Sequence, residues 1–138
     1  MERTLVIIKP EAVIKKLVGK IISMYEDNRL DIIHAHRCLP TKEVLGRHYK
    51  AHHGRDFYDS LVDFMSSSEV VVLILEGKNV VNIVREINGA TNPLKANAGT
   101  IRYMYGETVQ ENAVHGSESA QAANEEIEIW KDLIRFEI

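Results

Sequence analysis

Two unbroken apolar runs are the clearest strand signals in the chain. Residues 5–8 (Leu-Val-Ile-Ile) and residues 70–75 (Val-Val-Val-Leu-Ile-Leu) are rich in β-branched side chains and contain no polar residue. An unbroken apolar run predicts a strand that is covered on both faces. Residues 30–38 are a third predicted strand, with poor alternation of polar and apolar positions. A final strand is expected shortly before residue 112.

Apolar positions with helical spacing fill most of the sequence between these strands. The predicted helices cover residues 10–28, 42–53, 57–65, 80–87 and about 118–130. Pro10 suits the first turn of the first helix. Thr41 and Asn79 are predicted N-caps, and either Ser117 or Ser119 caps the last helix.

The order of these elements is strand, helix, strand, helices, strand, helix, strand, helix. Such an order is typical of a sheet with helices packed on it, although the connections leave the strand order open. Residues 89–99 are rich in turn-forming residues and predict a surface loop. Because no repeat, linker or block of charge divides the sequence, we expect residues 1–138 to form a single domain.

Composition and charge exclude several classes of protein. Hydrophobic residues make up 45% of the chain and charged residues 27%, values that exclude a disordered protein. A formal charge of −3 argues against a specific nucleic-acid partner. No apolar run approaches the roughly 20 residues that cross a bilayer, so no membrane association is expected. The sequence opens directly into a strand without a visible signal peptide and holds one cysteine, Cys38, which favours a cytoplasmic location.

Several common catalytic motifs are absent. The sequence contains no Gly-x-x-x-x-Gly-Lys-Ser/Thr loop, no Gly-x-Gly-x-x-Gly and no Gly-x-Ser-x-Gly. His48 and His52 lie four residues apart on a predicted helix and could ligate a metal, but no carboxylate lies between them in a zinc-type motif. Because that helix is mostly polar, we interpret both as surface histidines and expect no metal site made by the protein itself.

His115 has a different setting from the other histidines. Gly116 follows it, and serines that can cap a helix come next, so free backbone N–H groups and the positive end of a helix dipole should lie beside its ring. A neutral imidazole is a nucleophile near pH 7 and can carry a phosphoryl group. Glu126, on the following helix, could accept a hydrogen bond from the other ring nitrogen. The alternative is a histidine whose hydrogen bonds are satisfied within a turn.

Residues 112–119 (Asn-Ala-Val-His-Gly-Ser-Glu-Ser) resemble the active-site signature of nucleoside diphosphate kinases, Asn-x-x-His-Gly-Ser-Asp-Ser. Further segments are similar to that family in the same order and spacing: residues 2–13, Glu76-Gly77 with Arg85 downstream, residues 91–93 and residues 99–102. The resemblance therefore covers nearly the whole chain. It implies an α+β fold, a ferredoxin-like βαββαβ sandwich with a four-stranded antiparallel sheet and added helices.

The resemblance also implies an activity, which is transfer of the γ-phosphate of a nucleoside triphosphate to a nucleoside diphosphate. The mechanism would be ping-pong, through a phosphohistidine at His115, with Ser117 and Glu126 orienting the ring. The implied nucleotide-binding residues are a phosphate clamp of Arg85, Thr91 and Arg102, sugar and phosphate contacts from Lys9 and Asn112, Tyr49 near the phosphate, and Phe57 stacked on the base. Because stacking uses the face of a base, all bases should be accepted.

Cofactor and partners follow from the same resemblance. Mg²⁺ would be carried by the nucleotide phosphates, so no carboxylate cage is needed. The expected ligands are ATP, GTP, ADP, GDP and their deoxy forms. A homo-oligomer, either a tetramer or a hexamer, is expected.

Some of these residues have plainer explanations when each is taken alone. Phe57 fits the same apolar stripe as Leu61, and Tyr49 fits a surface helix. Arg85 and Arg102 fit solvated charges. The sequence also departs from the family pattern at Asp56 (usually proline), Glu118 (usually aspartate), residues 103–106 and Lys131. Asp56 bears on the geometry of the nucleotide lid, and none of the departures removes a group that the chemistry needs.

Two other functions stay open at this point. A non-catalytic nucleotide-binding module could share the fold, but it would have no use for a nucleophile at His115. A histidine phosphocarrier that serves protein partners would have no use for Phe57 or for the loop through Thr91. Phosphate exchange between GTP and ADP separates these possibilities.

Overall fold

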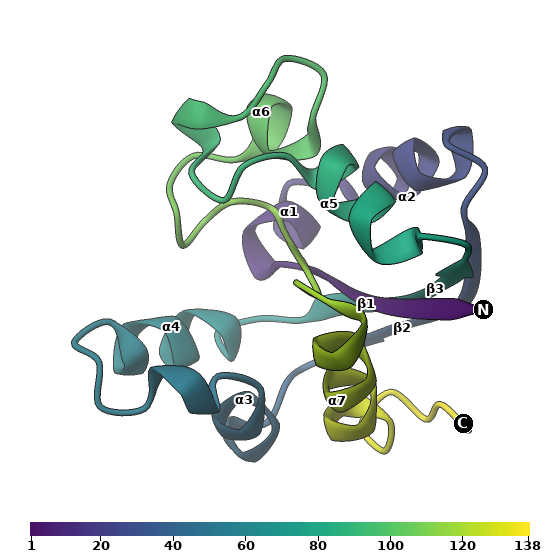
Figure 1. The fold of residues 1–138 in the computed structure, drawn as a ribbon. Helices are drawn as coiled ribbons and strands as arrows, with labels where there is room; N and C mark the ends of the chain where they lie inside the picture. Colours follow the sequence, from purple (N-terminus) through teal and green to yellow (C-terminus); the bar gives the residue numbers. More distant parts are fainter.

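Four antiparallel strands form one sheet at the centre of the molecule (Figure 1), as seen in a computed structural model that describes residues 1–138. The strands are β1 (Glu2–Ile8), β2 (Asp31–Cys38), β3 (Val70–Gly77) and β4 (Val114–Gly116). Their order in the sheet is β2-β3-β1-β4, and β1 pairs with β3 on one side and β4 on the other. This arrangement confirms the expected ferredoxin-like βαββαβ fold with added helices.

The helices cover the two faces of the sheet in separate layers (Figure 1). One layer holds α1 (Pro10–Ile14), α2 (Val18–Asp27), α5 (Val80–Asn88) and α6 (Ile101–Tyr105), and the other holds α3 (Lys42–His48), α4 (Tyr58–Met65) and α7 (Ala120–Trp130). Two short 3-10 helices, η1 (Lys50–His52) and η2 (Pro93–Lys95), lie in the connections. None of these helices combines the length and the apolar character that a membrane crossing requires.

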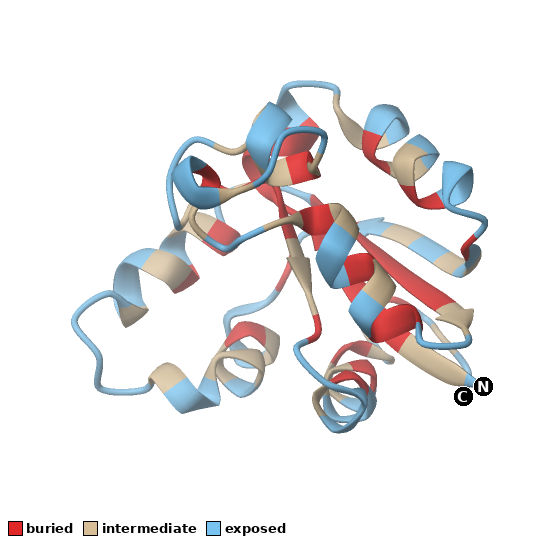
Figure 2. Cartoon of the chain, turned by 45° about the horizontal axis from the view of Figure 1, so that its top comes forward, coloured by how far each residue is buried: buried red, intermediate tan, exposed pale blue.

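The alternation of side chains along β1 divides the interior into two apolar cores. Leu5 and Ile7 pack against the layer of α3, α4 and α7, whereas Val6 and Ile8 pack against the layer of α1, α2 and α5. Figure 2 shows the buried residues concentrated along the central strands. Both faces of β1 and β3 are therefore covered, as their unbroken apolar runs predicted.

The single helix predicted over residues 10–28 is wrong, because the structure has two helices there. Lys16 adopts a φ of 64°, and its N–H donates to the carbonyl of Val13, while the N–H of Leu17 donates to the carbonyl of Ala12. This pair of bonds is a Schellman motif, which ends a helix with one left-handed residue. Glycine usually occupies that position, and lysine gave no such signal in the sequence.

Two further elements differ in their bounds from the sequence predictions, and one helix was not predicted. The helix predicted over 42–53 ends at His48 and continues as η1, while α6 is a helix that the sequence analysis did not predict. The final strand was expected before residue 112, which is wrong: β4 begins at Val114 and includes His115, which pairs with Ile7 of β1. Thr41 and Ser119 are N-caps, as predicted, since their side chains accept backbone N–H groups.

Asn79 is the N-cap residue of α5, but its side chain does not cap the helix. Its φ is 59°, and its Oδ1 accepts a hydrogen bond from the side-chain amide of Asn82 at 3.0 Å and none from a backbone N–H. The N–H of Val81 is bonded instead by the carboxylate of Glu2, at 3.0 Å. A carboxylate at this position also interacts favourably with the positive end of the helix dipole.

Two glycines with a left-handed backbone border the connection that leads to α6, and they allow a matched test of packing. Gly89 has a φ of 88°, and a Cβ there would lie 2.4 Å from Thr100 Oγ1. Gly99 has a φ of 89° with no atom within 4 Å of such a Cβ. We predict that Gly99→Ala lowers the free energy of unfolding by roughly 1–2 kcal/mol, the cost of a left-handed alanine. Gly89→Ala should lower it by a further 1–3 kcal/mol or so, because the neighbours must move.

Urea denaturation followed by circular dichroism measures both values. Equal losses in the two variants would show that the contact with Thr100 carries no energy and would contradict the prediction.

Candidate active site

A cleft of about 1430 Å³ opens at the free edge of β4. Its walls come from the end of β1, the segment between α3 and α4, the end of α5, the loop into α6, and α7. The cleft brings together all the site residues that the sequence predicted except Ser117, namely Lys9, Tyr49, Phe57, Arg85, Thr91, Arg102, Asn112, His115 and Glu126. Ser117 is fully buried behind it.

His115, Glu126 and Ser117 form a chain of hydrogen bonds. His115 Nε2 lies 2.9 Å from Glu126 Oε1, and the Ser117 hydroxyl donates to the same oxygen at 2.6 Å. The His115 side chain keeps 20% of its surface exposed, toward the cleft. Since a carboxylate only accepts hydrogen bonds, Nε2 of a neutral His115 carries the proton and Nδ1 keeps a free lone pair.

The surroundings of Glu126 keep its carboxyl group ionised. Burial by itself would raise the pKa of Glu126, but the hydrogen bond from His115, the charge interactions with His115 and His48, and the hydrogen bond from Ser117 together outweigh burial and leave the pKa below its ordinary value. An ionised carboxylate at neutral pH is the form that holds the Nε2–H of His115. This contact was expected from the sequence, because Glu126 lies on the helix that follows His115.

The interpretation of His48 as a surface histidine is wrong. Trp130 Nε1–H donates to His48 Nδ1 at 3.0 Å, and the ring of His48 lies 4.6 Å from that of His115, nearly perpendicular to it. Burial lowers the pKa of His48 to about 3, so its ring is neutral. The sequence could not show this position, because it depends on the packing of α3 against α7.

The His48, His115 and Glu126 side chains are also the one group that could hold a metal ion. A ring nitrogen of each histidine and a carboxylate oxygen lie within 4.8 Å of one another. The indole N–H of Trp130 occupies His48 Nδ1, which leaves the proton of the neutral His48 ring on Nε2. An ion would therefore have to displace a hydrogen bond that the group already makes, so its geometry fits a hydrogen-bonded network better than a coordination shell.

Four cationic side chains line the cleft, and three of them, Lys9, Arg85 and Arg102, were expected from the sequence. Lys9 is buried at the end of β1, where its Nζ donates to the carbonyl of Gln110 at 3.0 Å. Burial lowers the pKa of Lys9 to about 8; the nearby Glu11 opposes that shift and Arg102 adds to it. Arg85 is exposed on α5 and donates to the carbonyl of Glu118 at 3.3 Å.

Arg102 is the most constrained of these cations. One of its guanidinium nitrogens donates to the carbonyl of Gly89 and another to the carbonyl of Val114, both at 2.8 Å. Its Nε is buried and has no partner. Arg102 is thus a brace between the loop after α5 and β4, and it also has a spare donor in the cleft wall.

Asn112 has an unused acceptor. Its Nδ2 donates to the carbonyl of Thr91 at 2.9 Å, whereas its Oδ1 is buried without a partner. A buried polar atom without a partner costs free energy, so a ligand that donates to it regains that cost.

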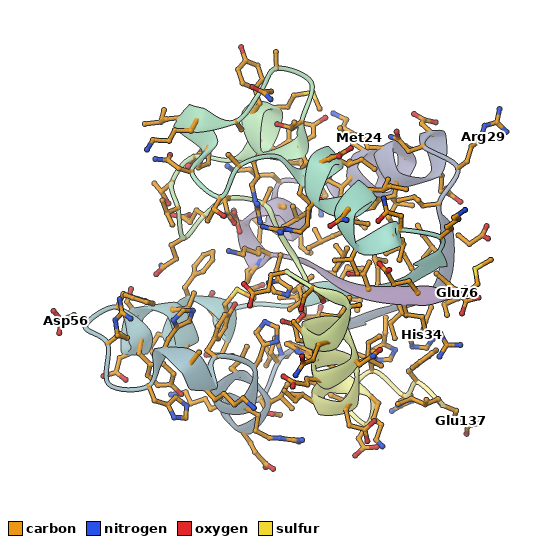
Figure 3. All side chains as sticks on the ribbon, viewed as in Figure 1. Met24, Arg29, His34, Asp56, Glu76 and Glu137 are labelled. Atoms are coloured by element: carbon orange, nitrogen blue, oxygen red, sulfur yellow. The ribbon has the colours of Figure 1, made fainter.

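The aromatic residues take separate positions around the opening. Phe57 is 43% exposed at the cleft and does not belong to the apolar core that its spacing with Leu61 suggested. Tyr49 is half-buried against the ring of His48. Asp56, the departure noted beside Phe57, lies at the outer tip of the α3–α4 segment and points away from the molecule (Figure 3).

Glu11 is a residue that the sequence analysis missed. Its carboxylate accepts the N–H of Ala113 at 2.9 Å, and Ala113 has a φ of 76° although it is not glycine. This bond therefore holds a strained residue between Asn112 and β4. No local pattern in the sequence points to it, because 102 positions separate the two partners.

These features together suit the handling of a phosphoryl group. A histidine nitrogen with a free lone pair faces a cleft lined by four cationic side chains, and two lining residues, Arg102 and Asn112, each have a buried polar atom without a partner. Cationic donors stabilise phosphate oxygens, and imidazole can accept the phosphorus.

Comparison with known proteins gives a consistent result. Residues 2–133 match the family model of nucleoside diphosphate kinase. A nucleoside diphosphate kinase of Campylobacter fetus is 50% identical over 127 residues, which are 92% of this chain and 93% of the relative. One from Desulforamulus reducens is 45% identical over 130 residues, which are 94% of this chain and 87% of the relative.

Solved structures of the same kind superpose closely. The nucleoside diphosphate kinase of Encephalitozoon cuniculi has a TM-score of 0.92 at 37% identity, covering 94% of this chain and 88% of that one. The enzyme from Aquifex aeolicus has a TM-score of 0.89 at 37% identity and covers 93% of both chains. The family match spans most of the sequence, and relatives are this similar over most of their own length, so this chain belongs to the nucleoside diphosphate kinase family.

Proposed function

We propose that His115 carries the phosphoryl group in the reaction of this family, transfer of the γ-phosphate of a nucleoside triphosphate to a nucleoside diphosphate. As a member of the family, the chain is a phosphotransferase that acts on nucleoside di- and triphosphates. The observation that carries the proposal for His115 is the Ser117–Glu126–His115 chain of hydrogen bonds. It assigns the ring proton to Nε2 and leaves the lone pair of Nδ1 in the cleft.

The reaction then has two half-steps of the ping-pong type. The Nδ1 lone pair of His115 attacks the γ-phosphorus, and the bond from that phosphorus to the bridging oxygen breaks, so the nucleoside diphosphate leaves with the electron pair. A terminal oxygen of a second nucleoside diphosphate next attacks the phosphohistidine, and the N–P bond breaks back to Nδ1. The Nε2 proton stays on the ring, where Glu126 stabilises the positive charge that develops.

The cationic residues act on the transferred group. We assign the phosphate clamp to Arg85, Arg102 and Thr91, with Lys9 contributing charge from the end of β1. Phosphoryl transfer is catalysed mainly by positioning and by stabilisation of charge on the phosphate oxygens. The spare Nε of Arg102 gives that residue a donor for a phosphate oxygen.

The sugar and the base bind farther out. The free Oδ1 of Asn112 can accept a hydrogen bond from a ribose hydroxyl, and the exposed face of Phe57 can stack on the base. We assign Tyr49, which lines the same cleft, to the phosphate side of the nucleotide, where its hydroxyl can approach a phosphate oxygen. Because a stacking contact reads no hydrogen-bonding edge, adenine and guanine nucleotides and their deoxy forms should all be substrates.

Nucleotide kinases of this kind use a divalent cation, and we propose that it is Mg²⁺ bound to the nucleotide phosphates. The candidate ligand group in the cleft contains two imidazoles, whereas Mg²⁺ prefers oxygen ligands. The ion would thus enter on the substrate and add positive charge beside the phosphates.

We further propose that residues 1–138 act as one domain within a homo-oligomer. β2 is an edge strand, and Ile33 and Leu39 are exposed on or beside it. An uncovered edge with apolar side chains favours association with another copy. Light scattering separates a tetramer from a hexamer. A cytoplasmic location stays a prediction, in keeping with the single free cysteine Cys38.

The first prediction from this mechanism concerns the nucleophile. His115→Ala should lower phosphate exchange between GTP and ADP by more than about 1000-fold, because no other group can form the intermediate. Incubation with γ-labelled ATP should give the wild type an acid-labile, base-stable label that the variant lacks. His36→Ala, on β2 and outside the cleft, serves as the control. Substantial exchange by His115→Ala would refute the proposed mechanism.

The two arginines should respond differently when each is removed. Arg85→Ala should lower kcat/KM about 100-fold without changing the melting temperature, because Arg85 is exposed and braces little. Arg102→Ala should lower kcat/KM similarly and also lower the free energy of unfolding by roughly 1–3 kcal/mol, since two carbonyls lose their donors. Arg47→Ala on α3 is the matched control for both measurements. An Arg102→Ala variant of unchanged stability would contradict the bracing role.

The lowered pKa of Lys9 predicts that kcat/KM depends on pH. Burial lowers its pKa to about 8, so the ammonium group is present below pH 8 and is lost as the pH rises through that value. We expect kcat/KM to fall between pH 7.5 and about 9 in the wild type. Arginine stays protonated over this range, so Lys9→Arg should show no such fall, whatever its absolute rate. An identical fall in the variant would assign the titration to another group.

A further inference from the structure

Asn88 is a buried polar residue beside the catalytic strand that the proposed mechanism does not use. It is the last residue of α5, it is 1% exposed, and it contributes to the wall of the cleft. Its Oδ1 accepts a hydrogen bond from the hydroxyl of Tyr25 at 2.6 Å. Tyr25, on α2, is itself fully buried.

The Tyr25 bond fixes the orientation of the Asn88 carboxamide. Burial raises the pKa of Tyr25 above its ordinary value, so the hydroxyl keeps its proton at neutral pH and acts as the donor. The carboxamide oxygen is thereby directed toward α2. The Nδ2 group, with its two N–H donors, is turned the opposite way.

Nδ2 lies against Gly116, the residue after His115. A Cβ at Gly116 would come within 2.7 Å of Asn88 Nδ2, so the amide rests directly on the backbone of β4. Nδ2 makes no hydrogen bond with any group of the chain, because the only bond of this side chain is the one from Tyr25. Nδ2 is not among the fully enclosed polar atoms that lack a partner, so it keeps access to the cleft that Asn88 lines, and its two N–H donors are available to a ligand there.

The position of Nδ2 gives it access to the same ligand as His115. Successive side chains of a strand point to opposite faces, so His115 and the contact between Asn88 and Gly116 lie on opposite sides of β4. β4 is an edge strand that pairs only with β1, and the cleft runs along its free edge. A ligand bound at that edge can therefore contact side chains from both faces of β4.

The contacts of Arg102 support a ligand at this edge of β4. Arg102 donates to the carbonyl of Gly89, which directly follows Asn88, and to the carbonyl of Val114, two residues before Gly116. Its unpartnered Nε belongs to the same guanidinium group. Arg102 therefore contacts the first residue of β4 and Asn88 the last, and the carbonyl of Gly89 links the two side chains. A negatively charged group bound along this short strand could accept hydrogen bonds from both.

We propose that Asn88 donates a hydrogen bond to a phosphate oxygen of the bound nucleotide at the free edge of β4. This rests on the proposed function, since it takes the phosphate group to be bound beside His115. The ligand class is the phosphate chain of a nucleoside di- or triphosphate, and Tyr25 acts as the positioning residue of the carboxamide.

A double substitution tests the contact without leaving a buried group unpaired. In Tyr25→Phe with Asn88→Leu, both partners become apolar, so the fold should tolerate the change. We expect kcat/KM for ADP to fall 10- to 100-fold and the dissociation constant for ADP to rise at least fivefold. The dissociation constant for adenosine, which has no phosphate, should stay within twofold of the wild type. Asn124→Leu, at an exposed position of α7, is the matched control.

Asn88→Asp is a second variant that keeps the shape of the side chain. Its carboxylate still accepts the hydroxyl of Tyr25 but presents an oxygen in place of Nδ2. It should lower kcat/KM for ADP more than the double variant does, because a carboxylate repels phosphate. Melting temperatures of both variants, measured beside the wild type, establish that the compared proteins are folded.

The outcomes separate this proposal from the proposed function. A wild type that does not exchange phosphate between GTP and ADP refutes the function itself. A wild type that exchanges phosphate, with both Asn88 variants folded and within twofold of its kcat/KM, overturns the role of Asn88 alone. Equal loss of affinity for ADP and adenosine would also overturn it, because the effect would then not involve the phosphate.

Discussion

The hydrogen bond between the Glu126 carboxylate and Nε2 of His115 is the interaction on which the proposed chemistry of the cleft depends. A neutral imidazole can carry its proton on either ring nitrogen, and this bond places it on Nε2. Nδ1 is then the nitrogen whose lone pair can act as a nucleophile. The bond requires β4 and α7 to keep a fixed separation, and Ser117 contributes by donating to the same oxygen from the strand side. Stability and reactivity are thus coupled at one carboxylate, because the bonds that hold α7 near the strand also set the state of the ring.

Long-range contacts to the backbone keep the rest of the cleft in register with that bond. Glu11 holds the N–H of Ala113, Arg102 holds the carbonyls of Gly89 and Val114, and Asn112 holds the carbonyl of Thr91. Each contact joins the segment that leads into β4 to a different part of the fold. The short strand β4, with only three residues, thereby obtains from side chains the rigidity that its own ladder cannot supply.

The sequence predicted the parts of this arrangement that local chemistry determines. The apolar runs of β1 and β3 identified strands covered on both faces, and the segment around His115 carried a recognisable signature. The helix break at Lys16 was missed because a lysine occupies a left-handed position where glycine is usual. α6 was missed because it is short and follows a loop rich in turn-forming residues.

Contacts that cross the fold were the part that the sequence could not provide. The residues around His48 in the sequence are typical of a polar surface helix. Only the packing of α3 on α7 brings its ring against His115. Asn88 and Tyr25 lie 63 positions apart and give no periodic signal. Glu126 was accessible to prediction for the opposite reason, since it lies on the helix that directly follows His115 and a carboxylate was required within reach.

The position of Trp130 has a consequence for how the enzyme can be observed. It is the only tryptophan of the chain, its indole N–H is bonded to His48, and His48 packs against His115. The emission of an indole responds to the charge and polarity around it. The chain therefore contains a single native fluorophore one ring away from His115, the proposed phosphoryl carrier, so formation of the proposed covalent state could be followed optically without a label.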